Sequence, residues 1–136
     1  MDINEAQDKV REFNEARGWK KDYNHRFIKD FLLNMAEEVG EAWSIIKWVD
    51  GETQRKLIEE HKDKFSDFVG DQLYLILKIA YLMDIDSEKA LRDTLEEYEQ
   101  RFPADKMKIV KHGNPLAGGV DDKAAVRKQE HKEEKD

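Results

Sequence analysis

Residues 73–83 read Leu-Tyr-Leu-Ile-Leu-Lys-Ile-Ala-Tyr-Leu-Met, and Lys78 is the one charged residue in this stretch. At 100° per residue, its apolar side chains surround a helix on nearly all sides, which is typical of a buried core helix. The stretch is too short to cross a bilayer, which needs about 20 apolar residues. We therefore expect a central helix over residues 63–83, with the rest of the fold packed around it.

Other segments also repeat apolar residues at helical spacing, and turn signals separate them. The first begins at Asp2, with Glu5 three residues later as in a capping box, and stops before Gly18. No segment alternates apolar and polar residues as a half-buried strand would. The sequence therefore predicts an all-α bundle of four to five helices, at residues 2–17, 25–48, 53–61, 63–83 and 87–101.

Two of these helices carry more detailed expectations. In residues 25–48 we expect the apolar stripe to centre on Met35, Val39 and Ile46. Gly40 is a poor helix former, so its place in this helix indicates that something approaches the backbone closely there. The helix at 87–101 is expected to point four residues inward: Ala90, Leu91, Leu95 and Tyr98.

The end of the chain differs in composition from what precedes it. The last expected helix is closed by Arg101-Phe102-Pro103, and the final fifteen residues are almost all charged or small. Such a composition cannot bury enough apolar surface to offset the entropy of ordering. We predict one all-α domain over residues 1–103 and an irregular, partly mobile C-terminal tail over residues 104–136.

Charge and composition exclude several classes of function. The 136 residues carry 24 Lys and Arg against 31 Asp and Glu, a net charge of −7, so we expect no nucleic-acid partner. There is no cysteine, which removes disulfides, thiolate metal sites and cysteine nucleophiles. We expect no signal peptide at the charged start of the given sequence and no membrane partner. These features predict a cytoplasmic protein.

Acidic residues gather at two places beside the expected core. Glu38 and Glu41 share a helix face, and Asp67 lies one turn before Asp71 at the entry to the apolar stretch. If the two helices pack antiparallel, these four carboxylates can converge. Their mutual repulsion would be offset by a divalent cation, and an all-oxygen set favours Mg²⁺ or Mn²⁺ over Zn²⁺. The alternative is plain solvated charge on a helical interaction module, since 31 acids produce such spacings by chance.

Residues 33–42, Leu-Asn-Met-Ala-Glu-Glu-Val-Gly-Glu-Ala, resemble the Glu-Glu-x-Gly-Glu signature of the MazG-like all-α nucleotide pyrophosphohydrolases. Residues 69–80 are similar to the second block of that family, where a glutamate and an aspartate three apart lead into an apolar helix. Residues 84–91 and 101–103 are similar to the loop that starts its last helix and to the segment that closes it. The resemblance covers residues 25–105.

The resemblance implies hydrolysis of a nucleoside triphosphate, often a deoxynucleotide, to the monophosphate and pyrophosphate. It also implies a homodimer or homotetramer and Mg²⁺ ligation by Glu38, Glu41 and Asp71, with Glu37 as a further acid of the motif. This chain departs from the pattern at Phe68, which stands where the second block has its glutamate; Asp67 is our substitute ligand. The last helix of the family offers a lysine and an asparagine to the phosphates, at positions that here hold Thr94 and Tyr98.

These observations assign provisional roles. Glu38 is the first choice for orienting or deprotonating the attacking water, and Lys78 and Arg101 are the candidates for binding phosphate. An aromatic surface for the base is expected from Trp19, Tyr23 and Trp48. A second possibility is a homologue that binds nucleotide and metal but hydrolyses weakly because of Phe68. Four short helices cover the stretch 73–83 poorly, which independently favours an oligomer.

Overall fold

The structure is a computed structural model of the full chain, and it describes residues 1–19 and 25–126. These residues form helices and no strand, so the predicted all-α fold is confirmed. The elements are α1 (Ile3–Glu15), α2 (His25–Ser44), α3 (Gly51–Glu60), α4 (Lys62–Leu82), α5 (Ser87–Arg101), α6 (Ala104–Val110) and the 3₁₀ turn η1 (Pro115–Ala117). No helix among the described residues combines the length and apolarity needed to cross a membrane.

The helices belong to two compact units, Met1–Ser87 and Glu88–Asp136. The boundary therefore falls at the start of α5, sixteen positions before the predicted end of the domain at residue 103. The prediction that residues 104 onward are irregular was wrong for α6, which forms a regular helix. The prediction of a mobile end concerns residues 127–136, which lie outside the described residues.

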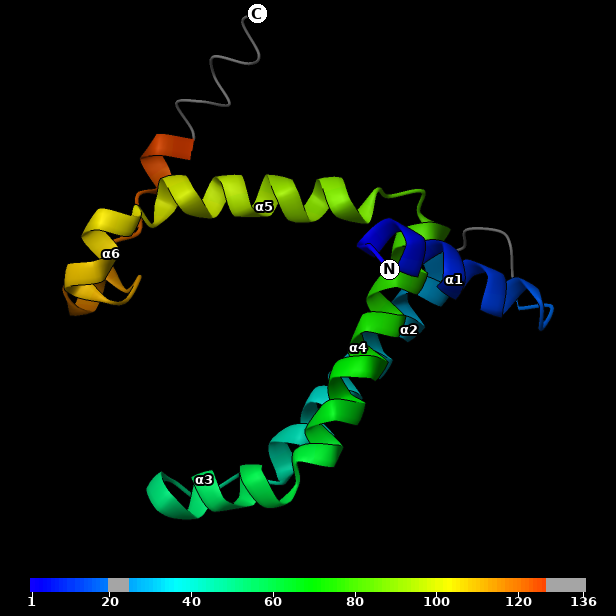
Figure 1. The fold of residues 1–136 in the computed structure, drawn as a ribbon, viewed down its shortest axis with the longest axis horizontal. Helices are drawn as coiled ribbons and strands as arrows, with labels where there is room; N and C mark the ends of the chain where they lie inside the picture. Colours follow the sequence, from blue (N-terminus) through cyan, green and yellow to red (C-terminus); the bar gives the residue numbers. More distant parts are fainter. Residues whose placement is uncertain (20–24, 127–136) are drawn as a thin grey trace, which may run out of the picture. The chain divides into compact units, whose positions relative to one another are not determined.

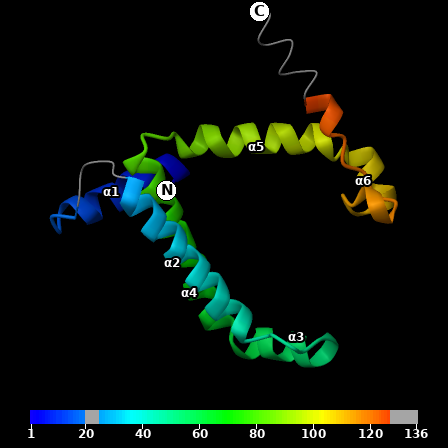
Figure 2. The ribbon, with the colours of Figure 1, turned by 180° about the vertical axis from the view of Figure 1, so that it is seen from behind.

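In the first unit, α4 is the central helix. Both α1 and α2 pack along it, and α3 contacts it more weakly. Figures 1 and 2 show α2 and α4 side by side and running in opposite directions. A hydrogen bond from Gln72 Nε2 to the carbonyl oxygen of Met35, 2.9 Å long, joins the two helices near their middles. The antiparallel pairing on which the acidic site depends is therefore present.

The apolar stretch of α4 is covered on two sides only. Leu75, Leu77, Ala80 and Leu82 are buried. Leu73, Ile76 and Met83 remain 50%, 47% and 41% exposed, which agrees with the expectation that four short helices cover residues 73–83 poorly. The reason is geometric: among the described residues α1 and α2 pack along α4, and the apolar residues of α4 extend round the helix beyond the sides that these two helices cover.

Helix α1 begins and ends as predicted. The Asp2 carboxylate accepts a hydrogen bond from Glu5 N–H, and the Glu5 carboxylate accepts one from Asp2 N–H, which completes the capping box. Gly18 adopts a φ of +67°, a left-handed conformation that lets the chain turn back so that Trp19 N–H reaches the Asn14 carbonyl. This turn places the Trp19 ring edge-on to Phe13.

A buried polar contact fixes α1 against α4. Asn14 is fully buried, its Nδ2 donates to the Val10 carbonyl, and its Oδ1 accepts a 2.9 Å hydrogen bond from the Tyr74 hydroxyl. A buried amide is tolerated only when its polar atoms have partners, so this contact restricts how α1 can slide along α4.

The apolar stripe of α2 faces a direction that the sequence did not predict. Met35 and Ala42 are partly buried towards α4, as is Glu38, whereas Val39 is 51% exposed. The contact face is therefore rotated towards Glu38. Apolar residues surround most of α2, so periodicity alone could not choose among its faces. At Gly40 a Cβ atom would meet nothing within 4 Å, so no part of the described chain approaches the backbone there.

The second unit consists of α5, α6 and the segment that follows them. The expectation that α5 points apolar residues inward was wrong, because Ala90, Leu91, Leu95 and Tyr98 are all exposed. Instead, the chain after α6 returns to the end of α5, where Asp122 N–H donates to the Arg101 carbonyl. This bond is one of the contacts that fix the returning chain at the end of α5.

The Asn14–Tyr74 contact can be tested by mutation. Asn14→Ala leaves the part-buried Tyr74 hydroxyl without its acceptor, so we expect the free energy of unfolding to fall by about 1–3 kcal/mol. Tyr74→Phe should cost a similar amount, and the double variant should cost less than the sum of the two single changes. Urea denaturation followed by circular dichroism measures all three values, and strict additivity would contradict a direct contact.

Candidate acidic site

The antiparallel contact of α2 and α4 forms a cleft of about 430 Å³. Its wall includes all four carboxylates that the sequence singled out as metal ligands. The lining residues are Glu38, Glu41, Ala42, Ser44, Ile45, Lys64, Asp67, Phe68 and Asp71. The structure thus brings the predicted acids from two helices into one cavity, whereas Glu37 is exposed and does not line it.

Glu38 is the acid most strongly influenced by its neighbours. Partial burial raises the pKa of its carboxyl, and the charges of Glu41, Asp71 and Glu37 raise it further. A hydrogen bond with the Asp71 side chain adds to the effect.

The donors in this cleft fit a hard divalent cation by their chemistry. They are carboxylate oxygens on facing helices, which Mg²⁺ and Mn²⁺ prefer, and the chain has no cysteine thiolate to favour a softer ion. Among the described residues, no three histidine, aspartate or glutamate side chains lie close enough together, in their present rotamers, to hold a metal ion. Asp and Glu rotate about two or three bonds, so the helices fix which acids face the cleft rather than a finished ligand set.

Lys78 lies in a box of aromatic rings. Its Nζ is 4.4 Å from the ring centre of Phe31, 5.6 Å from that of Trp19 and 5.7 Å from that of Tyr74. Burial among these rings lowers the pKa of the Lys78 ammonium group. The sequence also left open a salt bridge from Lys78 to a carboxylate of α2. Within the described part of the chain no carboxylate forms an ion pair with Lys78. Ring faces attract the ammonium without neutralising it, which leaves its charge available to an anion.

Lys78 also lies on the same side of α4 as Asp71. The two residues are seven positions apart, which is two helical turns and about 10 Å along the axis. Phosphate groups of a triphosphate span a comparable length, so a cation at this distance suits the far end of such a chain. Lys64 provides a second cation, in the wall of the cleft itself.

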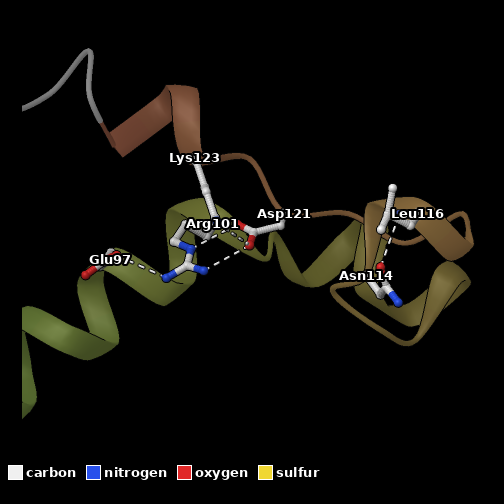
Figure 3. A network of polar contacts seen from close by, with 6 residues as sticks. All are labelled: Glu97, Arg101, Asn114, Leu116, Asp121 and Lys123. Atoms are coloured by element: carbon white, nitrogen blue, oxygen red, sulfur yellow. Dashed lines mark hydrogen bonds and ion pairs between the residues drawn. The ribbon is translucent and has the colours of Figure 1, made fainter.

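Arg101, the other residue predicted to bind phosphate, already forms ion pairs with two acidic side chains. It belongs to the second unit, where its Nε and Nη2 atoms donate to the two carboxylate oxygens of Asp121, both at 2.9 Å. A third bond of 3.2 Å goes to Glu97 (Figure 3). The Asp121 carboxylate raises the pKa of Arg101, and Arg101 in turn lowers that of Asp121. We interpret this bidentate pair as structural and do not carry Arg101 into the site.

Of the aromatic residues predicted to bind the base, Trp19 and Trp48 lie at opposite ends of α2. Trp19 lies beside Lys78 and Phe31, while Trp48 follows the other end of α2, edge-on to Trp43. About 20 Å of helix axis separates Phe31 from the end of α2, so one base cannot stack on both tryptophans of the same chain. Neither lines the acidic cleft, and Tyr23 lies outside the described residues.

Some residues of the site were missed by sequence reasoning. Ser44 and Ile45 line the cleft because they stand three and four positions after Glu41 and share its face. Lys64 likewise precedes Asp67 by three positions. Helical spacing could have found these residues. Phe31 was not connected with Lys78, because only the packing of α2 against α4 brings its ring there.

No protein-family model matches the sequence, and no curated protein does either. Among solved structures, the chain is similar to the crystal structure of a pyrophosphatase from Archaeoglobus fulgidus DSM 4304. The two share 24% sequence identity with a TM-score of 0.62, over 74% of this chain and 92% of the other. At this identity the likeness establishes the fold: the chain has the all-α fold of that pyrophosphatase.

The raised pKa of Glu38 predicts a pH-dependent effect of Glu38→Gln. The folded protein binds the Glu38 proton more tightly than the unfolded chain, so this group favours folding below its ordinary pKa of 4.5. That contribution is lost as the pH rises through the higher pKa of the folded state. We therefore expect Glu38→Gln to match the wild type in free energy of unfolding near about pH 4 and to exceed it at pH 7.

Urea denaturation at stepped pH values measures this difference. Glu12→Gln, on the exposed side of α1, is the matched control and should give a flat profile. If the free energy of unfolding of Glu38→Gln differed from that of the wild type by the same amount at every pH, a raised pKa of Glu38 in the folded chain would be contradicted.

Proposed function

We propose that this chain is a MazG-like pyrophosphohydrolase that converts a nucleoside or deoxynucleoside triphosphate to the monophosphate and pyrophosphate, with Mg²⁺ as cofactor and Mn²⁺ as the other candidate. One observation carries the proposal: the four acids of the sequence motifs line one cleft between two antiparallel helices. The structural neighbour supports it, since that protein is described as a pyrophosphatase and has the same fold.

The residues that would hold the cation are Glu38, Glu41 and Asp71, with Asp67 as a fourth donor. When bound, the ion supplies positive charge to the phosphates and to the oxygens that become more negative during phosphoryl transfer. The chain contributes the geometry, because each helix holds two acids one turn apart on the wall that faces the other helix.

Glu38 is the proposed general base. The pKa of its carboxyl is raised, and a higher pKa makes the carboxylate a better acceptor of a proton from water. The oxygen of that water forms a bond with the α-phosphorus while the bond from phosphorus to the bridging oxygen breaks. The proton passes to Glu38, and the electron pair leaves with pyrophosphate. Asp71 lies in the same cleft wall and contributes to the negative charge that raises the pKa of Glu38.

Lys78 is the proposed ligand of the terminal phosphates. Its ammonium group is held among aromatic rings on the Asp71 side of α4, and it can offer its charge to pyrophosphate as this forms. Lys64 can meet phosphate at the cleft wall.

A specific observation favours a second candidate, in which the protein binds nucleotide and metal but hydrolyses weakly. Phe68 lines the cleft at the position where the resembled family has a glutamate. An aromatic ring there removes one oxygen donor and makes the cavity more apolar. The third possibility, an interaction module with no catalytic role, would leave the convergence of the four acids unexplained.

The test is a panel of nucleoside and deoxynucleoside triphosphates, incubated with and without Mg²⁺, with release of pyrophosphate as the measurement. We expect Mg²⁺-dependent release that Glu38→Gln and Asp71→Asn each reduce by about 10²–10⁴-fold. Glu96→Gln, on the exposed surface of α5, should retain full activity. Mg²⁺ binding by calorimetry without release from any substrate would favour the weakly hydrolysing homologue, and absence of both would overturn the proposal.

Replacing Lys78 tests the phosphate site. Lys78→Met keeps the apolar stem among the rings but removes the charge, so we expect kcat/KM to fall about tenfold or more, equivalent to about 1.4 kcal/mol. Lys78→Arg should restore part of the loss, and Lys29→Met, on the exposed side of α2, is the matched control. Steady-state kinetics on the best substrate decides, and an unchanged kcat/KM in Lys78→Met would remove Lys78 from the site.

A further inference from the structure

The acidic cleft extends to one side of its acids. Its lining residues on the α2 side stand at or after Glu38, and those of α4 stand at or before Asp71. Because the two helices run in opposite directions, as Figures 1 and 2 show, both sets lead towards the same end of the helix pair. The cavity therefore runs from Glu38 and Asp71 towards the end of α2 and the start of α4.

Lys78 lies on the other side of the acids. It stands seven positions after Asp71, about 10 Å along the axis of α4. The Phe31 ring, whose centre is 4.4 Å from the Lys78 Nζ atom, belongs to a residue seven positions before Glu38. Neither Lys78 nor Phe31 is among the described residues that line the cleft. The acids thus separate a cation at one end from a cavity at the other.

This arrangement gives a bound nucleoside triphosphate a direction, which rests on the proposed function. In that reaction the α-phosphorus lies at the acids, and the leaving pyrophosphate meets Lys78. The sugar and base are attached on the opposite side of the α-phosphorus, because that atom joins them to the leaving group. The nucleoside therefore enters the cavity on the side away from Lys78.

The wall of this cavity suits the flat, partly apolar body of a nucleoside. Its apolar part is formed by Ala42 and Ile45 on the α2 side and by Phe68 of α4. Beyond the acids, its polar groups are those of Ser44 and Lys64. Small-molecule sites commonly combine an apolar wall with a few polar groups that fix the orientation of the ligand. An inorganic phosphate chain is charged along its whole length and would gain nothing from the apolar part.

Phe68 supplies the aromatic ring of this wall. It is half-buried and stands three positions before Asp71, so the two residues share a side of α4 one turn apart. One turn is about 5 Å, which lets the ring contact a sugar or base whose α-phosphate lies at Asp71. Trp19 and Trp48, which the sequence suggested for the base, do not line the cavity.

We propose that Phe68 makes this site select nucleotides over inorganic phosphate chains, by packing its ring against the nucleoside in the cavity that it shares with Ile45. Base–aromatic stacking is tolerant of sequence, because every base has an aromatic face. The departure from the family pattern at this position then has a physical reason. An oxygen donor to the metal is exchanged for a surface that contacts the substrate.

Binding without hydrolysis is the first test. The probes are the α,β-methylene analogues of the common nucleoside triphosphates, which cannot release pyrophosphate, and the bis(methylene) analogue of inorganic tripolyphosphate. Each is titrated by calorimetry in the presence of Mg²⁺. Phe68→Leu keeps an apolar side chain but removes the ring. We expect it to raise the dissociation constant of the best nucleotide analogue at least about tenfold, and that of the phosphate-only analogue less than about twofold.

Two further variants separate stacking from packing. Phe68→Tyr retains the ring and should bind the nucleotide analogue about as the wild type does. Val69→Ala, at the next position and with an exposed side chain, is the matched control and should bind both probes unchanged. Circular dichroism at 222 nm checks that each variant stays helical. Equal losses for the two probes in Phe68→Leu would show that the ring merely packs the helices, and would overturn the proposal. So would an unchanged affinity for the nucleotide analogue.

Hydrolysis gives a second readout. The ratio of kcat/KM for the best nucleoside triphosphate to kcat/KM for inorganic tripolyphosphate should fall at least about tenfold in Phe68→Leu. Lys78→Met removes a phosphate contact that both substrates share, so it should lower both values and leave their ratio near that of the wild type.

The binding data also separate this inference from the proposed function. A wild-type chain that binds the nucleotide analogues but hydrolyses no substrate would contradict the proposed reaction, while Phe68→Leu still decides the role of the ring. A wild-type chain that binds the phosphate-only analogue as tightly as every nucleotide analogue would overturn selection by Phe68 and leave the cleft a phosphate site. Binding of neither probe would overturn both.

Discussion

The antiparallel contact of α2 with α4 determines most of what this molecule can do. It is held by Met35 and Ala42 against the apolar side of α4, and by the hydrogen bond from Gln72 to the Met35 carbonyl. Sliding either helix by one turn, about 5 Å, would separate Glu38 from Asp71 and open the cleft. The site therefore depends on a packing register that is itself made from ordinary core contacts.

This contact brings together groups that repel one another. Burial and three neighbouring charges raise the pKa of Glu38, which means that its ionised form is disfavoured in the folded chain. Such a cluster lowers stability unless a cation or a proton offsets the charge, as is common where a protein gives up stability for function. The aromatic box keeps the Lys78 ammonium group near the same side of α4 without pairing it to an acid. The arrangement suits a ligand that carries negative charge of its own.

The same two helices form the acidic cleft and also leave apolar side chains exposed, because the apolar residues of α2 and α4 extend beyond the sides that the described chain covers. In the second unit, the Arg101–Asp121 pair shows a different solution, where a bidentate ion pair fixes the returning chain in place of an apolar core.

Sequence alone determined the helices, because their signals are local. The capping box at Asp2, the left-handed Gly18 and the apolar period of residues 63–83 each depend on neighbours within a few positions. It also selected the four cleft acids, since i, i+3 and i, i+4 spacing follows from one helix. Tertiary packing decided which side of α2 faces α4, that Arg101 is bound by Asp121, and that three rings surround Lys78. These outcomes depend on contacts between residues distant in the chain, and an all-round apolar helix leaves its own orientation undetermined.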